Sequence, residues 1–242
     1  SVCIADQNVD SLRNAIAAMD WKNGKWESND RPNNELGIPC VALTSPTASP
    51  DAPRYPMVIE SIPERLDMKR DFFTKIEPLV DPATVLCTNT STLRISDIAS
   101  GLSRPNQFCG MHFFMPVEHR SAVELIRGEE TDGATIAVAS HHIESLHKSP
   151  LIVSDSPGFI VNRLLSPYLN EALTLLCQGV SAEAIEAAAF DYGMPMSPLE
   201  LIDTIGTRTM FDAGRVYWQA FPNRIAPSPL LAGLVKSKRI GK

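Results

Sequence analysis

The hydrophobic pattern of this 242-residue chain changes character near Ser154. Before that point, short apolar runs alternate with longer stretches of helical periodicity, which predicts a parallel α/β sheet with helices between its strands. After it, the strand-like runs stop and helical periodicity takes over. We therefore predict two domains, an α/β domain over residues 1–154 and an all-helical domain over residues 155–242.

The expected elements follow from these runs. In the first domain, strands are predicted at Ser1–Asp6, Pro39–Thr44, Met57–Ile62, Thr84–Thr88, Phe108–Phe114, Ala122–Ile126 and Leu151–Val153, and helices at Val9–Met19, Glu64–Leu79, Leu93–Leu102 and Gly133–Leu146. Residues 23–36, rich in Asn and Asp, and residues 45–56, with four prolines, are expected to form loops. In the second domain, helices are predicted from the Ser156–Pro157 pair to Gly179, over Ala182–Asp191 and from Pro198 onward.

Composition excludes several classes of protein. A net charge of −6, with no basic block except Lys236–Arg239, argues against a nucleic-acid partner. The chain has no apolar run of membrane-spanning length and no basic signal-like start, so we expect a soluble, cytoplasmic protein without a membrane span. Its five cysteines form no Cys-x-x-Cys pair, which argues against disulfides and a zinc site. We expect buried free thiols and no metal.

Four short motifs carry most of the candidate chemistry. They are Asn-Thr-Ser-Thr at 89–92, Met-His-Phe-Phe-Met-Pro at 111–116, Val-Glu-Leu-Ile at 123–126 and Asp-Ser-Pro-Gly-Phe-Ile-Val-Asn-Arg at 155–163. In this order and at these spacings, they resemble the 3-hydroxyacyl-CoA dehydrogenase family, including the dehydrogenase part of multifunctional fatty-acid oxidation proteins. The resemblance extends over nearly the whole chain from Val58 onward. It implies a Rossmann-like NAD-binding domain followed by an all-α domain that forms a homodimer.

His112 is the candidate base. Oxidation of a secondary alcohol needs a group that takes the hydroxyl proton while hydride leaves the carbon, and imidazole titrates in the right range. A carboxylate on the far ring nitrogen would fix the tautomer and stabilise the imidazolium. Glu124, on the next predicted strand, can supply it if the two strands pair. The other histidines, His119, His141, His142 and His147, fall on polar stretches and are expected at the surface.

Two further side chains are expected near the substrate. Ser91 follows the strand that ends at Thr88 and so lies at the carboxyl edge, where ligands of open α/β sheets bind. Asn162 lies near the start of the first helix of the second domain and can add a hydrogen bond. The resemblance implies that His112 is the base, that Glu124 orients it, and that Ser91 and Asn162 position the substrate.

The expected cofactor is NAD, but its usual fingerprint is missing. A dinucleotide fold begins with a strand, a Gly-x-Gly-x-x-Gly turn and a helix, and no Gly-x-Gly occurs in this sequence. In the complete fold, the acid that binds the ribose ends the second strand, whereas Asp6 ends the first strand of this chain. The chain is therefore predicted to begin after the first strand, glycine turn and helix of the complete fold. By resemblance, Asp6, Glu64, Lys69 and Ser91 match cofactor-contacting positions. Met115 stands where the family has an Asn that contacts the cofactor.

The predicted reaction is reversible oxidation of an L-3-hydroxyacyl-CoA to the 3-ketoacyl-CoA, with acyl-CoA as substrate. Three alternatives stay open. The chain could be a related dehydrogenase of a free hydroxy acid, resembling the L-gulonate type. It could be an incomplete protein that binds acyl-CoA or dimerises without catalysis, or one segment of a multifunctional protein. Chain-length preference does not follow from the sequence.

Overall fold

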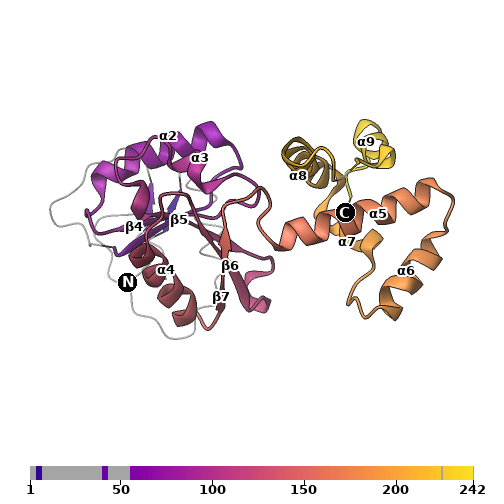
Figure 1. Ribbon diagram of the computed structural model, residues 1–242, viewed down its shortest axis with the longest axis horizontal. Coiled ribbons are helices and arrows are strands. Elements are labelled where there is room, and N and C mark those ends of the chain that lie inside the picture. Colours follow the sequence, from indigo (N-terminus) through magenta and orange to yellow (C-terminus); the bar gives the residue numbers. More distant parts are fainter. Residues whose placement is uncertain (1–3, 7–39, 43–54, 225, 242) are drawn as a thin grey trace. The chain divides into compact units, whose positions relative to one another are not determined.

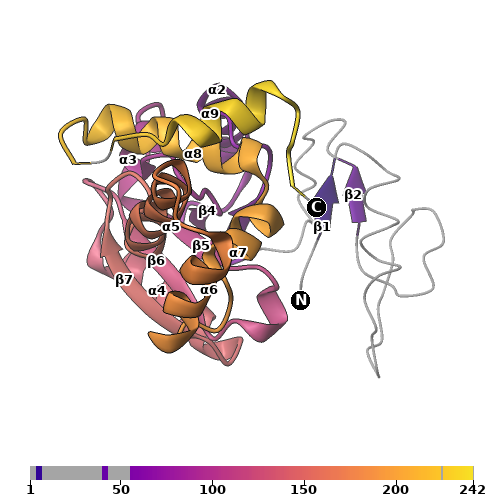
Figure 2. The ribbon, with the colours of Figure 1, turned by 90° about the vertical axis from the view of Figure 1, so that its right-hand side faces the viewer.

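The computed structural model describes residues 4–6, 40–42, 55–224 and 226–241, and divides into two compact units. In the first unit, strands β1 (Ile4–Asp6) and β2 (Cys40–Ala42) pair in parallel (Figure 2), and a 3₁₀ turn, η1, covers Glu77–Leu79. Both strands lie within predicted ones. The helix expected over Val9–Met19 and the loop over residues 23–36 lie outside the described residues.

The second unit contains a five-stranded sheet in the order β3-β4-β5-β6-β7 (Figure 1). Its strands are β3 (Met57–Glu60), β4 (Val85–Thr88), β5 (Phe108–Phe113), β6 (Ala122–Arg127) and β7 (Ser149–Ser154). All neighbouring strands are parallel except β5 and β6, which run antiparallel. The predicted parallel α/β sheet is therefore confirmed except at this pair. The connection from β5 to β6 holds only a 3₁₀ turn, η3 (Val117–His119), and a parallel crossover needs a longer segment.

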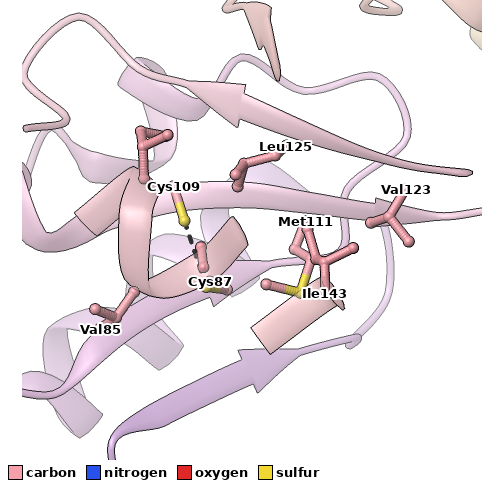
Figure 3. Packing of buried hydrophobic residues seen from close by; sticks show 9 residues of the cluster. Val85, Cys87, Cys109, Met111, Val123, Leu125 and Ile143 are labelled. Atoms are coloured by element: carbon pink, nitrogen blue, oxygen red, sulfur yellow. Dashed lines mark hydrogen bonds between the residues drawn. The ribbon is translucent and has the colours of Figure 1, made fainter. Parts of the chain in front are cut away.

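The helices of this unit cover both faces of the sheet. They are α2 (Leu66–Ile76), α3 (Ile95–Ala99) and α4 (Gly133–Ser145), and Figure 1 shows α2 and α3 on one side and α4 on the other. Side chains of β5 alternate between them. Phe108 meets Phe73 of α2 edge to face, with ring centroids 4.7 Å apart, whereas Met111 packs in the cluster that includes Ile143 of α4 (Figure 3). Because the alternation has a period of two, His112 shares the face of Phe108.

The cysteine prediction is only partly confirmed. Cys87 of β4 and Cys109 of β5 are free, fully buried and in register, with their Sγ atoms 3.4 Å apart (Figure 3). Burial and the neighbouring Cys109 thiol raise the pKa of Cys87 well above its usual range, with the mutual hydrogen bond as the largest cause. Cys177 is also free, but it is exposed at the end of a helix, so the expectation of burial was wrong there.

Five helices follow the sheet in the part of the chain that the structure describes. They are α5 (Val161–Cys177), α6 (Ala182–Asp191), α7 (Pro198–Ile205), α8 (Thr207–Ala220) and α9 (Pro229–Lys236). Their shared core contains buried apolar residues from α5, α7, α8 and α9, namely Leu169, Leu173, Ile202, Met210 and Leu231. No helix in the described part of the chain combines the length and the hydrophobicity needed to cross a membrane. The expected run of helices is therefore present, whereas the exact boundary between the two predicted domains stays a prediction.

Helix α5 begins four residues later than predicted. The sequence suggested a start at Pro157, but Gly158 and Phe159 both have positive φ, +73° and +51°, and the first helical residue is Val161. Two consecutive residues in the left-handed region cannot continue a right-handed helix. The segment before Val161 is therefore a turn, and its conformation determines where the first amides of α5 point.

Gly110 tests how tightly the helices pack on the sheet. A Cβ at this position would lie 2.6 Å from Cδ1 of Ile95 and 3.0 Å from Cβ of Ile126, and both isoleucines are fully buried. We expect Gly110→Ala to lower the free energy of unfolding by about 1–3 kcal/mol, because a packed core resists added volume. Urea unfolding measures the change. Gly133→Ala is the matched control, because nothing lies within 4 Å of its Cβ; equal losses in both variants would contradict the described packing.

Candidate active site

His112 and Glu124 form a buried pair across two strands. Antiparallel pairing of β5 and β6 places the two residues directly opposite each other, and Nδ1 of His112 lies 2.8 Å from Oε2 of Glu124. The Glu124 side chain is fully buried and that of His112 is 6% exposed. The sequence analysis placed Glu124 beside His112 only if these two strands pair. They do pair, in the register that sets the two side chains opposite each other.

The other oxygen of Glu124 binds the start of α5. Oε1 accepts hydrogen bonds from the backbone amides of Ile160 and Val161, both at 2.9 Å. Burial acts to raise the pKa of Glu124, but the hydrogen bond with His112, the two amides and the nearby imidazole outweigh it, so the pKa lies below its usual range. Glu124 is therefore a carboxylate at neutral pH, and a helix N-terminus is a favourable place for that charge.

The imidazole of His112 is held in one orientation. Its ring contacts those of Phe114 and Phe159, with centroids 4.7 Å and 5.8 Å away. Because a carboxylate only accepts hydrogen bonds, Nδ1 carries the proton directed at Glu124, and in the neutral imidazole Nε2 then has a lone pair. Nε2 has no hydrogen-bond partner within the described part of the chain. The pair therefore presents a basic nitrogen ready to accept a proton.

Three of the four remaining histidines lie at the surface, as the sequence indicated. His119, His141 and His147 are exposed, and His142 is half-buried near the end of α4. Burial and the neighbouring His141 lower the pKa of His142. Only His112, among the described histidines, is paired with a carboxylate.

Ser91 and Asn162 are brought together as well. Nδ2 of Asn162, in the first turn of α5, donates to the backbone oxygen of Ser91 at 3.3 Å. Asn162 directly follows Val161, whose amide binds Glu124, so a continuous set of contacts joins all four predicted residues. The Ser91 hydroxyl forms no hydrogen bond within the described residues. Its oxygen is thus available to a ligand.

The Glu64 carboxylate organises the loop that carries Ser91. Oε1 of Glu64 accepts from the Thr90 hydroxyl at 2.6 Å, from the Ser91 and Thr92 amides at 2.9 Å each, and from the Thr92 hydroxyl at 3.0 Å. Burial acts to raise the pKa of Glu64, but these hydrogen bonds and the charge of Lys69 lower it overall. In this structure, Glu64 therefore fixes the backbone of the loop beside the site.

Lys69 is enclosed by the protein. Its side chain is fully buried, and Nζ donates to Oε1 of Glu60 at 2.7 Å and to the carbonyl of Ile62 at 3.1 Å, with Oε2 of Glu64 at 3.7 Å. Glu60 also accepts from the Thr88 hydroxyl at 2.7 Å. The ammonium is thus satisfied by groups of the chain itself, and its predicted contact with a cofactor stays a prediction.

Two other predicted positions lie at strand ends. Asp6 is the last residue of β1, where only the backbone is described, so its predicted ribose contact stays a prediction. Met115 follows β5, and its side chain is exposed. The predicted loss of an Asn contact at Met115 is likewise untested.

Sequence reasoning missed Glu60 and Asn89. Glu60 and Thr88 are register partners at the carboxyl ends of β3 and β4. Ser91 was selected because ligands bind at this edge of the sheet, and the same reasoning applied to Glu60 and Thr88. Oδ1 of Asn89 accepts from the amide of Phe113 at 3.0 Å, and the Asn89 amide reaches the Ser61 hydroxyl at 3.3 Å. Asn89 thereby ties the loop after β4 to the end of the strand that carries His112.

Comparison with known proteins identifies the family of this chain. The family profile described as "3-hydroxyacyl-CoA dehydrogenase, NAD binding domain" matches residues 1–156, and that of the C-terminal domain matches residues 158–242. The chain belongs to the 3-hydroxyacyl-CoA dehydrogenase family. It is similar to the (S)-3-hydroxybutyryl-CoA dehydrogenase of Ralstonia eutropha, with 34% identity and a TM-score of 0.78 over 85% of this chain and 72% of that chain.

Two further solved structures are similar. A 3-hydroxybutyryl-CoA dehydrogenase of Escherichia coli has 30% identity and a TM-score of 0.85, over 100% of this chain and 52% of that chain. M. tuberculosis FadB2 has 28% identity and a TM-score of 0.77, over 97% of this chain and 80% of that chain. Members of the dehydrogenase family are NAD-dependent oxidoreductases, and the match to the NAD-binding domain identifies NAD as the cofactor of this chain.

The described residues of this dehydrogenase fit the nicotinamide end of NAD. Nε2 of His112 and the Ser91 hydroxyl, both without partners among the described residues, lie near the carboxyl ends of β4 and β5 or just beyond them. Dinucleotides bind at this edge of such sheets. The glycine turn that would hold the pyrophosphate does not occur in the 242 residues. A dinucleotide bound at this edge would therefore meet two polar atoms that have no hydrogen-bond partner among the described residues.

Glu64→Gln tests whether this carboxylate stabilises the loop. Because the folded pKa of Glu64 lies below its unfolded value of about 4.3, its contribution is complete above that pH and is lost as the pH falls through the folded value. We expect the variant to be less stable by about 1 kcal/mol at pH 7, since charge-assisted hydrogen bonds become neutral ones. Urea unfolding measures the difference in the free energy of unfolding between the variant and the unmodified chain. This difference should be smaller at pH 3 than at pH 7.

The exposed Glu144 on α4 offers the control. Glu144→Gln should change stability by less than about 0.5 kcal/mol at both pH values. The described role of Glu64 would be contradicted if the difference in the free energy of unfolding between Glu64→Gln and the unmodified chain stayed constant or widened toward acid pH.

Proposed function

We propose that the chain catalyses reversible oxidation of L-3-hydroxyacyl-CoA to 3-ketoacyl-CoA in fatty-acid β-oxidation, with NAD as hydride acceptor. The observation that carries this proposal is the buried His112–Glu124 pair, with Nδ1 and Oε2 2.8 Å apart and Nε2 left to act as a base. Family membership supports the chemistry, and the names of the similar proteins indicate the class of substrate.

In the proposed reaction, Nε2 of His112 removes the proton of the substrate hydroxyl as the C3–H bond breaks. Bound NAD supplies an electrophilic nicotinamide carbon that accepts the hydride. Glu124 stabilises the imidazolium through Nδ1 and keeps the ring aligned, and it acts as a carboxylate throughout because its pKa is low. In the reverse direction, the same imidazolium returns the proton to the ketone oxygen.

Ser91 and Asn162 are assigned to substrate positioning. The Ser91 hydroxyl can donate to the reacting oxygen, which develops negative charge during deprotonation. The contact of Asn162 with the Ser91 carbonyl keeps its amide beside the same loop, where it can share the substrate oxygen. Glu64 supports both by holding the Ser91 backbone.

We also propose a homodimer formed through the helical part and a cytoplasmic location. Leu164 of α5, Phe190 of α6 and Tyr192 just after α6 are more than half exposed, and exposed apolar side chains of this size are typical of subunit contacts. The neighbouring free thiols of Cys87 and Cys109 are in keeping with a reducing compartment. Sedimentation measurements on the purified chain test the dimer.

His112→Gln tests the proposed base. Glutamine keeps a polar side chain on β5 but cannot accept the substrate proton, so we expect kcat for acetoacetyl-CoA reduction to fall about 10²–10⁴-fold. Disappearance of NADH absorbance measures the rate. Adding Glu124→Gln to this variant should lower kcat little further, because residues that act as a unit are not additive.

The exposed His119 provides the matched control. His119→Gln should keep kcat within about twofold of the unmodified chain, as surface changes remote from the site usually do. Unchanged turnover in His112→Gln, in a preparation whose unmodified chain is active, would refute the assignment of the base.

The substrate class has its own test. If the thioester is recognised, kcat/KM for acetoacetyl-CoA should exceed that for free acetoacetate by at least about 10²-fold, because binding energy from remote parts of a substrate assists the reacting centre. Comparable values for the two would favour a hydroxy-acid dehydrogenase instead. Calorimetric titration with NADH separates both from a non-catalytic protein, for which no binding heat is expected.

A further inference from the structure

The turn before α5 has an unusual backbone conformation directly before the amides that bind Glu124. Gly158 and Phe159 have φ values of +73° and +51°, and both residues are buried. For glycine the left-handed region carries no steric penalty, but for a phenylalanine it is strained. Such a conformation persists only when its surroundings impose it. The amides of Ile160 and Val161, which bind Glu124, immediately follow this turn.

Tyr217 of α8 lies directly on the turn. A Cβ built on Gly158 would overlap Cε1 of the Tyr217 ring and come within 2.7 Å of its hydroxyl oxygen, so only glycine leaves room for the ring. Tyr217 is 2% exposed, and the side chain of Ser166 on α5 lies near its hydroxyl. The buried ring is thus packed against the backbone of the turn.

Two carboxylates act electrostatically on Tyr217. Burial raises the pKa of Tyr217 to about 12, with the charges of Glu124 and Glu64 adding to the rise and the nearby Ser166 side chain opposing it. The hydroxyl therefore stays neutral at physiological pH. The contribution that the geometry supports is the packing of the ring on the turn.

We propose that Tyr217 is a positioning residue for the His112–Glu124 pair, acting through the Gly158–Phe159 turn. Its ring holds the two left-handed residues in place, so that the amides of Ile160 and Val161 point at Oε1 of Glu124. Phe159, at the same turn, keeps its ring against the imidazole of His112. This inference rests on the proposed function for its effect on turnover, but its effect on the pair can be measured without substrate.

The first measurement follows the proton on Nδ1 of His112 by NMR, in the full chain without ligands. A histidine proton shared with a buried carboxylate gives a downfield resonance, which His112→Gln identifies by removing it. Tyr217→Leu keeps an apolar side chain on α8 but loses the flat ring. We expect this variant to exchange the Nδ1 proton with solvent at least tenfold faster. Tyr217→Phe, which retains the ring, should preserve the resonance.

Met210→Ala controls for simple destabilisation of the helices. Met210 is also on α8, and it packs in the helical core rather than on the turn. It should lower the melting temperature at least as much as Tyr217→Leu and leave the Nδ1 resonance unchanged. Equal effects of Met210→Ala and Tyr217→Leu on the resonance would overturn the proposal, as would an unchanged resonance in Tyr217→Leu.

The second measurement uses turnover. For acetoacetyl-CoA reduction, Tyr217→Leu should lower kcat about tenfold with KM within about twofold, because a shifted base affects the reacting step more than substrate binding. Tyr217→Phe should keep at least half of kcat. If His112→Gln abolishes turnover but Tyr217→Leu does not lower it, the positioning role fails while the proposed function stands. If His112→Gln keeps full turnover, the proposed function fails, and the NMR result alone decides the positioning role.

A double-mutant cycle connects the ring to the turn. Gly158→Ala pushes a methyl group into the Tyr217 ring and should lower kcat at least tenfold with an accelerated Nδ1 exchange. Since the three nearest atoms to that methyl all belong to Tyr217, Gly158→Ala should cost clearly less in the Tyr217→Leu background than in the unmodified chain, where the clash adds to the strain of the positive φ. Independent, multiplicative effects of the two changes would contradict the proposed route.

Discussion

The buried carboxylate of Glu124 is the interaction on which the site depends. An ionised carboxylate removed from water is costly unless hydrogen bonds replace its hydration. Glu124 has three, from the imidazole of His112 and from the amides of Ile160 and Val161. Because these donors come from a strand and from a helix start, one side chain fixes the position of both. Loss of either partner would leave part of the charge uncompensated.

The antiparallel pairing of β5 and β6 is what makes this arrangement possible. Directly opposite residues of an antiparallel pair have their Cβ atoms about 4.5–5.5 Å apart, which suits a hydrogen bond between an imidazole and a carboxylate. A slip of one residue would turn Glu124 to the other face of the sheet, toward Cys109, Met111 and α4. The apolar residues of that face, Val123 and Leu125, are fully buried and hold the register. Packing of Val123 and Leu125 on one face of the sheet thus keeps Glu124 opposite His112 on the other face.

The sequence predicted those parts of the structure that depend on local periodicity and on strand pairing. His112 opposite Glu124 follows from two adjacent strands with alternating side chains, and that geometry is confirmed. The start of α5 was mispredicted, because Ser-Pro is a good local start signal and nothing in the local sequence shows the positive φ of Phe159. The burial of Lys69 was not foreseen for the same reason. Its partner Glu60 lies on another element, and no local pattern shows which charges meet.

The first amides of two helices, α3 and α5, donate hydrogen bonds to carboxylates from distant segments of the chain. Neither α3 nor α5 has a side-chain hydrogen bond from its own N-cap residue. Asp155, just after β7, accepts the amides of Ile95 and Ser96 at the start of α3, at 2.8 Å and 2.9 Å. Glu124 does the same for α5. Helix starts capped in this way are held by tertiary structure, because the acceptor is present only after the sheet has formed.

This mode of capping has a consequence for the site. The segment between Asp155 and Val161 is tied at its first residue to α3 and at its last to Glu124. With both ends fixed, the backbone between them has little freedom, and it contains the left-handed pair at Gly158 and Phe159. A locally capped helix could shift along its axis without breaking a tertiary contact. Here any such shift would withdraw the two amides from Glu124, and the orientation of His112 would be lost with them.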